Sequence, residues 1–336
     1  MTYHAQEVSI GVLKNAENCV LVSKRKSGSD FAGFWELPGG KRKSGETNEV
    51  ALVRELKEEL GIDVSRFRPL IKIRNDSSTP LVDLHVFEIL DWFGKPIPRE
   101  GQEIRWISKK EFLDLKFPKG NAGINSALFL PSLVLVTPTL LGDINHYVDE
   151  IFRLIKSGIK LVHIRPSINS DKVLRELTNI LASRISSSNA QIMINGKMSF
   201  FDEQIFQGLH LNSFEASLIS SRPVSESQLF STSCHNFHEL EHAQKIGADF
   251  VFISPIRKTS THPDASPLGW YDLRRLVQRA VVPVYALGGL SCRDIMSARE
   301  IGCQGIAMKN TLWNASNPSV LVNRCHECLD RLERCL

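Results

Sequence analysis

The chain has 336 residues, of which 42% are hydrophobic and 23% charged, and its formal net charge is +4. This length suits two domains better than one core. The charge is too mild and too scattered to indicate nucleic-acid binding. The apolar run at residues 128–136 is broken by Pro131 and Ser132 and is too short to span a bilayer, so we expect no membrane segment.

The number of cysteines and the N-terminal residues indicate in which cellular compartment we expect the protein. The chain has seven cysteines, an odd number, and residues 1–10 show no basic region followed by an apolar stretch. Both features fit reduced thiols in the cytoplasm, which is the location we expect. Neither feature indicates an oligomeric state.

The first part of the chain alternates strand-like runs with one amphipathic helix. We expect the helix at residues 48–60, closed by Gly61, because glycine best accepts the left-handed position after a helix. The expected strands are residues 7–13, 18–23, 70–73, 81–90 and 103–107. Residues 117–123 break regular structure, so we place a first domain at 1–130 and a second at 131–336.

The helix gathers three carboxylates on one face. At about 100° per residue, Glu55, Glu58 and Glu59 fall within roughly a 100° arc. The residues expected to face the core are Val50, Leu52, Val53, Leu56 and Leu60. Crowded carboxylates near a helix C-terminus repel one another and oppose the helix dipole. A divalent cation would neutralise them, and hard oxygen ligands suit Mg²⁺.

The spacing around this helix resembles the Nudix box at every fixed position. Gly40 is followed after five residues by Glu46, and after seven more by the run Arg-Glu-Leu-Lys-Glu-Glu-Leu-Gly-Ile at 54–62. The resemblance implies an α/β/α sandwich with a mixed sheet, and a Mg²⁺-dependent hydrolase with Mn²⁺ as an alternative ion. It also implies a role for each matched residue. Glu55, Glu58 and Glu59 would be metal ligands together with the backbone at Gly39 and Gly40, Arg54 would orient a carboxylate, and Glu46 would support the loop.

The flanks of the box resemble MutT-type 8-oxo-dGTP diphosphatases. The matching segments are residues 34–40, 99–102, 106–108 and 117–121. By this resemblance Glu100 is a metal ligand or general base, Arg25 faces the nucleotide, and Asn121 reads the base. An amide suits that role because it offers both a donor and an acceptor to a purine edge. The expected reaction converts 8-oxo-dGTP and water to 8-oxo-dGMP and pyrophosphate, which sanitises the nucleotide pool for DNA replication and repair.

Beyond residue 130 short apolar strands alternate with helices. The expected strands are residues 133–137, 161–164, 191–194, 208–211, 229–233, 250–253, 282–287 and 305–308. Eight βα units in this length predict a closed (β/α)₈ barrel of the TIM type, with an open doubly wound sheet as the alternative. Polar residues such as Arg165 and Asn195 follow the strand ends, where a barrel keeps its active site.

Residues 133–315 resemble the thiamine phosphate synthase and thiazole tautomerase superfamily. The matching residues are Ser233-Cys234-His235, the loop 254–262 with Thr259 and Thr261, and the glycine turn 288–290 centred on Gly289. The resemblance implies that the loop and the turn hold the phosphate of a thiazole-like ligand. His235 has two open interpretations: an acid–base residue, as in the tautomerases, or a polar residue at a helix start.

The barrel also departs from the synthase pattern. Where a working synthase has Gln-any-Arg-any-Lys, this chain has His163, Arg165 and Ser167. Its Asn-Asp pair is replaced by Asn195 and Gly196, and Glu215 stands for a later aspartate. The missing lysine and carboxylate predict a barrel that binds a phosphate ester but does not make thiamine phosphate.

Two alternatives to the sanitising hydrolase remain open. In one, the chain is a thiamine-pathway enzyme whose first domain hydrolyses a pyrimidine or thiamine diphosphate. In the other, it is a regulatory fusion whose barrel binds a phosphorylated ligand without chemistry. Shared pathway membership of fused domains is an association rather than a physical argument.

Overall fold

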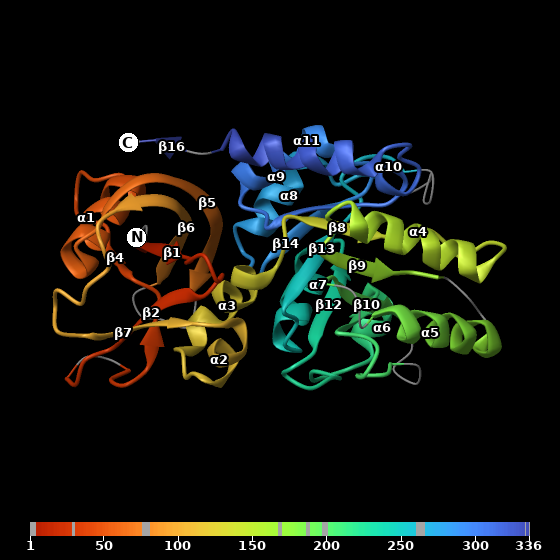
Figure 1. Cartoon of the computed structure of the whole chain (residues 1–336), viewed down its shortest axis with the longest axis horizontal. Helices are drawn as coiled ribbons and strands as arrows, with labels where there is room; N and C mark the ends of the chain where they lie inside the picture. The colour runs from red at the N-terminus through yellow and green to blue at the C-terminus, as the bar shows by residue number, and fades with distance from the viewer. Residues whose placement is uncertain are drawn as a thin grey trace. The chain divides into compact units, whose positions relative to one another are not determined.

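Two sheets and one closed barrel organise the chain in the computed structural model (Figure 1). The structure describes residues 5–28, 31–75, 81–166, 170–185, 189–196, 201–259, 266–332 and 334–335. It divides into one unit of Met1–Phe129 with Arg331–Leu336, and a second unit of Leu130–Asp330.

The first unit contains two sheets. The five-stranded sheet has the order β16-β5-β6-β1-β4, and the three-stranded sheet has the order β3-β2-β7. The strands are β1 Gln6–Leu13, β2 Val20–Lys24, β3 Trp35–Glu36, β4 Gly39–Lys41, β5 Asp63–Asn75, β6 Val82–Phe93, β7 Glu103–Ile107 and β16 Arg334–Cys335. Because β1 pairs parallel with β6 and antiparallel with β4, the predicted mixed sheet is confirmed. Strand β16, which the sequence did not predict, pairs with β5 at Arg66 and Phe67.

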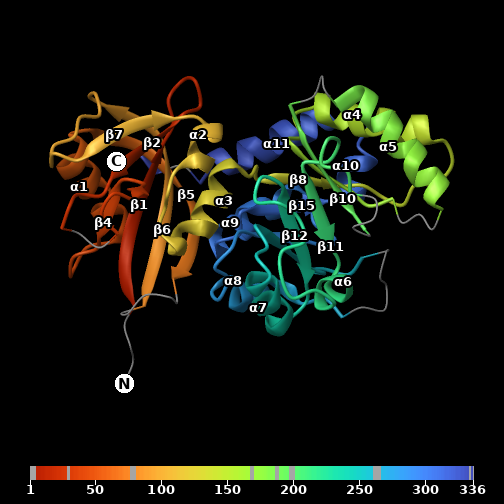
Figure 2. The same cartoon turned by 90° about the horizontal axis from the view of Figure 1, so that it is seen from below.

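Helix α1 (Asn48–Leu60) has the predicted bounds. The Thr47 side chain accepts a hydrogen bond from the backbone of Val50 at 3.3 Å, and Gly61 ends the helix with φ 72°. Figures 1 and 2 both show α1 beside β4. Its buried face joins the core of this unit, whose members include Leu13, Leu21, Leu52, Leu56, Leu60, Phe67 and Phe87. The remaining helices are α2 Lys109–Asp114, η1 Lys119–Asn121 and α3 Ala122–Phe129.

One expectation about α1 is wrong. Val50 was expected to face the core but is 52% exposed, whereas Leu52 is completely buried. Two residues correspond to about 200° around a helix, so Val50 lies on the opposite side from Leu52. Glu59 lies seven positions after Leu52, which is almost two full turns of the helix, so its side chain lies beside the buried face of α1.

The second unit is a closed barrel of parallel strands, so the predicted (β/α)₈ architecture is confirmed and the open sheet is wrong. The strands are β8 Leu133–Val136, β9 Leu161–Ile164, β10 Gln191–Asn195, β11 Gly208–Leu211, β12 Leu229–Cys234, β13 Phe250–Ile253, β14 Val284–Leu287 and β15 Gly305–Met308. The helices are α4 Ile144–Lys156, α5 Asp171–Ile185, α6 Ser213–Ser217, α7 Phe237–Lys245, α8 Gly269–Val277, η3 Cys292–Asp294, α9 Ile295–Ile301, α10 Asn310–Trp313 and α11 Pro318–Asp330. Searching the described residues reveals no helix long and apolar enough to cross a membrane.

Candidate functional site

The Gly39–Gly40 backbone of β4 receives two carboxylates from α1. The Gly39 amide donates to Glu59 Oε2 at 3.1 Å. Gly39 has φ 146°, and a Cβ there would lie 2.2 Å from the Ser9 carbonyl oxygen, so only glycine fits. A Cβ on Gly40 would lie 2.4 Å from the carboxyl carbon of Glu55. Gly40 therefore lets the Glu55 carboxylate approach the strand, whereas Gly39 lets β4 lie close to β1 while its amide binds Glu59.

Arg54 connects the other acidic residues of the box. Its guanidinium donates to both oxygens of Glu46, at 2.7 and 2.9 Å. Nη1 also donates to Glu55 at 2.6 Å and to Glu58 at 3.1 Å. The hydrogen bonds from Arg54, with one from the Lys43 backbone, lower the pKa of Glu46 to about 2. Arg54 thus fixes the loop before α1 and the direction of two of the helix carboxylates.

Glu59 lies in a strongly negative environment. Burial raises its pKa to about 8, and the nearby carboxylates of Glu36, Glu100 and Glu55 add to the rise. The Gly39 amide opposes the rise but does not cancel it. Carboxylates brought this close in a partly buried position favour binding of a cation between them.

The loop that carries Glu100 is attached to the end of α1. The Glu100 N–H donates to Gln102 Oε1 at 3.0 Å, and Gln102 Nε2 donates to the Glu59 carbonyl at 3.1 Å. The Arg99 N–H donates to the same carbonyl at 3.0 Å. Gln102 is buried, and the resemblance to the MutT-type enzymes assigns it no role. The sequence signal that could have indicated Gln102 is a side-chain amide directly before the strand at residues 103–107.

The oxygen atoms of the box carboxylates suit a divalent cation, although the described side chains do not form a ready-made metal site. Among the described residues, no three His, Cys, Asp or Glu side chains are grouped closely enough to hold a metal ion. Glu55 and Glu58 point to Arg54, and Glu100 lies 3.5 Å from Lys26 Nζ. The fit rests on the oxygen chemistry of these side chains and on the glycine backbone that Glu55 and Glu59 approach.

Arg25 and Asn121 occupy two different elements of the same unit. Arg25 follows β2, and its Nε lies 3.0 Å from Glu36 Oε2. Burial raises the pKa of Glu36, and the charge of Arg25 opposes that rise. Asn121 ends η1 and is half-buried, with its backbone N–H bonded to the Pro118 carbonyl at 2.9 Å.

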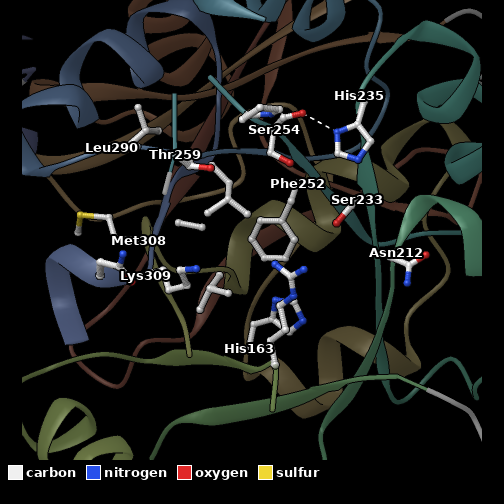
Figure 3. A pocket seen from close by; sticks show the side chains of 18 of the residues that line it. His163, Asn212, Ser233, His235, Phe252, Ser254, Thr259, Leu290, Met308 and Lys309 are labelled. Carbon is white, nitrogen blue, oxygen red and sulfur yellow. Dashed lines mark hydrogen bonds between the residues drawn. The ribbon is translucent and has the colours of Figure 1, made fainter. Parts of the chain in front are cut away.

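The barrel holds a cavity of about 710 Å³ lined by residues that follow its strands. Figure 3 shows His163 and Phe252 in this cavity, and their rings are stacked with centroids 5.5 Å apart. His210 is bonded to Ser231 Oγ at 2.8 Å and to Ser233 Oγ at 3.0 Å. Both ring nitrogens of His163 are buried without a hydrogen-bond partner.

The glycine turn after β14 packs against the loop after β13. Gly288 and Gly289 have φ of 107° and 68°, and a Cβ on Gly289 would lie 2.8 Å from the Lys258 carbonyl oxygen. The Arg257 N–H donates to the Gly288 carbonyl at 3.1 Å. Thr259 and Gly289 line the same cavity, whereas Thr261 lies outside the described residues.

His235 also lines the cavity (Figure 3). Its Nδ1 contacts the Ser254 carbonyl oxygen at 2.5 Å. Because a carbonyl only accepts, Nδ1 carries the proton and the neutral ring keeps Nε2 as an acceptor. That arrangement permits acid–base chemistry at Nε2.

Comparison with known proteins identifies both parts. The NUDIX domain model matches residues 4–128, and the thiamine monophosphate synthase model matches residues 133–312. The 8-oxo-dGTP diphosphatase of Haemophilus influenzae is 34% identical over 34% of this chain and 85% of its own length. The putative thiamine-phosphate synthase 2 of Aquifex aeolicus is 30% identical over 48% of this chain and 87% of its own length. The chain belongs to both families.

A thiamine-phosphate synthase of Syntrophomonas wolfei is 27% identical to this chain, over 55% of it and 90% of the relative. The Nudix part makes the chain a pyrophosphohydrolase, and both families act on small phosphorylated molecules. In the synthase-family barrel, Glu215 does not line the cavity among the described residues. It instead caps α6, accepting from the Asn212 N–H at 3.1 Å while its own N–H donates to Asn212 Oδ1 at 2.9 Å.

Proposed function

We propose that the Nudix part is a Mg²⁺-dependent 8-oxo-dGTP diphosphatase that sanitises the nucleotide pool in the cytoplasm. One observation carries the proposal: Glu55 and Glu59 converge on the Gly39–Gly40 backbone, and Glu100 lies close enough to raise the pKa of Glu59. The similarity to an 8-oxo-dGTP diphosphatase, which extends over 85% of that relative, supports the choice of substrate.

In the proposed reaction, water attacks within the polyphosphate and the bridging P–O bond between the α- and β-phosphorus atoms breaks, which releases 8-oxo-dGMP and pyrophosphate. Bound Mg²⁺, with Mn²⁺ as an alternative, would neutralise polyphosphate charge and make the water more acidic. Glu55, Glu58 and Glu59 would hold the ion together with the backbone at Gly39 and Gly40. Glu100 accepts the proton that the water loses. The hydrogen bonds of Gln102 hold the Glu100 loop at the end of α1, next to the other carboxylates.

Arg54 acts on the carboxylates rather than on the substrate in this proposal. Its bonds to Glu55 and Glu58 restrict both side chains to one side of α1. Arg25 and Asn121 contact the nucleotide. The Asn121 amide presents one donor and one acceptor to the edge of the oxidised purine, a pair that unmodified guanine matches less well.

The test supplies the purified full-length protein and Mg²⁺ with normal, oxidised and thiamine-related phosphates. We expect the highest kcat/KM for 8-oxo-dGTP, with pyrophosphate as the released product. Release of inorganic phosphate, or a preference for an unoxidised nucleotide, would contradict the proposal. Removal of divalent ions with EDTA should abolish turnover.

A second candidate rests on the synthase-family match at residues 133–312 of the same chain. In this alternative the Nudix part hydrolyses a pyrimidine or thiamine diphosphate. The same substrate panel separates the two candidates, because a thiamine-related diphosphate would then give the highest kcat/KM.

A further inference from the structure

An exposed phenylalanine lies in the loop between β2 and β3. Phe31 is 56% exposed, although burial of such a ring is favourable. Its backbone has φ 58°, in the left-handed region that a bulky residue rarely adopts. Among the described residues, Asn18 is the other non-glycine residue with positive φ, and asparagine tolerates that region. The position of Phe31 is therefore unfavourable in two respects, an exposed ring and a strained backbone.

Hydrogen bonds at the base of the loop impose this conformation. The Arg25 N–H donates to the Phe34 carbonyl at 2.9 Å, and the Gly33 N–H donates to the Arg25 carbonyl at 3.0 Å. The Phe34 N–H also donates to the Phe31 carbonyl at 3.0 Å. Strained residues that their surroundings hold in place are typical of ligand-binding positions. The strain at Phe31 thus indicates a position that is held for a ligand.

Contacts of Arg25 connect Phe31 to the carboxylates of the Nudix part. The guanidinium carbon of Arg25 lies over the Phe31 ring, 5.9 Å from its centroid. The Nε atom of the same guanidinium lies 3.0 Å from Glu36 Oε2. The charge of Glu36 in turn adds to the raised pKa of Glu59. Phe31 is therefore linked to the candidate metal-binding carboxylates through two side chains.

A second aromatic ring lies beside Phe31. The rings of Phe31 and Phe34 meet edge to face, with centroids 5.8 Å apart and an interplanar angle of 68°. This contact and the Arg25 contact fix the Phe31 ring, yet more than half of the residue stays open to solvent. A fixed and exposed aromatic ring beside a guanidinium suits a planar heteroaromatic ligand, which can stack on it.

We propose that Phe31 binds the nucleobase of the substrate by stacking. This inference rests on the proposed nucleotide hydrolase function, and it adds an apolar contact to the polar contacts of Arg25 and Asn121. Stacking does not depend on the positions of donors and acceptors, so Phe31 strengthens the binding of any aromatic base, whereas Asn121 selects among purines. Loss of the ring should therefore affect binding of the nucleoside part and leave binding of pyrophosphate unchanged.

The experiment uses the two reaction products as inhibitors of the full-length enzyme in the presence of Mg²⁺. Phe31→Ala should raise the inhibition constant of 8-oxo-dGMP about tenfold, the usual effect of losing one stacking contact. The inhibition constant of pyrophosphate should not change, because pyrophosphate has no base. An unchanged ratio of the two inhibition constants would overturn the inference.

The design separates this inference from the proposed function. If the wild-type enzyme prefers a different compound, the monophosphate product of that compound replaces 8-oxo-dGMP as the inhibitor. A wrong substrate assignment is then seen in the kcat/KM values of the wild type, whereas a wrong role for Phe31 is seen in the ratio of the inhibition constants.

Further variants separate the ring from the backbone strain. Phe31→Gly removes the ring and relaxes the positive φ, so it should melt no lower than Phe31→Ala yet bind 8-oxo-dGMP as weakly. Phe31→Tyr keeps an aromatic ring and should bind like the wild type. Tyr271→Ala is the matched control on α8 of the barrel, since Tyr271 is 75% exposed and has the Arg275 guanidinium 6.0 Å from its ring centroid. Equal inhibition constants of 8-oxo-dGMP for Phe31→Gly and Tyr271→Ala would contradict the assignment.

Discussion

The two parts of the chain build their candidate sites from side chains of opposite charge. In the Nudix part, Glu55 and Glu59 approach the Gly39–Gly40 backbone, and the charges of Glu36, Glu100 and Glu55 add to the raised pKa of Glu59. In the barrel, Arg165 and Lys309 share a cavity whose described lining has no carboxylate. The comparison teaches that two families acting on small phosphorylated molecules can place opposite charges at their candidate sites. Carboxylate oxygens attract cations, whereas a cavity lined by Arg and Lys attracts anions.

The prediction with the largest expected effect tests whether the barrel catalyses Mg²⁺-dependent synthesis of thiamine phosphate. With the pyrimidine diphosphate, the thiazole phosphate and Mg²⁺, we expect thiamine phosphate formation at least about a thousandfold below a synthase that has the full motifs. Each lost charge-stabilising group typically costs about 10²–10³ in rate. Gly196 offers no carboxylate, and Glu215 is engaged as a helix cap. Turnover at the rate of a biosynthetic enzyme would show that the barrel does recruit the metal.

The second largest effect is expected from substitution of the carboxylates of the Nudix part. Glu58→Gln or Glu59→Gln should lower kcat about a hundredfold or more, because each removes a charged oxygen ligand. Glu49→Gln, in the first turn of the same helix, is the matched control and should keep ordinary activity. Full activity of Glu58→Gln and Glu59→Gln at saturating Mg²⁺ would contradict the proposal that these residues hold the metal ion.

Base recognition should respond more moderately. Asn121→Ala should lower the preference for 8-oxo-dGTP over dGTP about ten- to a hundredfold, the range for a buried amide paired to a base. The measurement compares kcat/KM for both nucleotides in wild type and variant. If the ratio stays constant, the base is read elsewhere or an oxidised purine is not the substrate.

The smallest effect concerns Gln102, a positioning residue. Gln102→Leu removes the bond to the Glu100 N–H and the bond to the Glu59 carbonyl but leaves the Arg99 bond to that carbonyl, and we expect kcat to fall about fivefold to tenfold with KM nearly unchanged. The pH dependence of kcat should shift at the same time, since Glu100 would lose its fixed place. Gln102→Asn provides the conservative comparison. A change in melting temperature alone, with kcat intact, would mean that Gln102 is only structural.

Local features of the sequence were sufficient for the helix and most barrel strands. The bounds of α1 follow from Thr47, whose side chain caps the first turn, and from Gly61, which accepts a left-handed conformation. The strands at 161–164, 208–211, 250–253 and 305–308 have the predicted limits, because each is a short apolar run between polar breaks. The sequence also predicted the box residues of α1, since their spacing is fixed by the helix itself.

Only the tertiary structure decided how those residues are paired and how deeply they are buried. Val50 faces solvent, although it belongs to an apolar run, because the helix turns it away from Leu52. The proximity of Glu36 to Glu59 and the attachment of Glu100 through Gln102 depend on loops that return to the end of α1. Arg165 and Lys309 share one cavity because the barrel closes and brings β15 and β9 to either side of β8. Caps and periodicity act within a few residues, whereas the charge of a site is set by groups that meet only after the chain has folded.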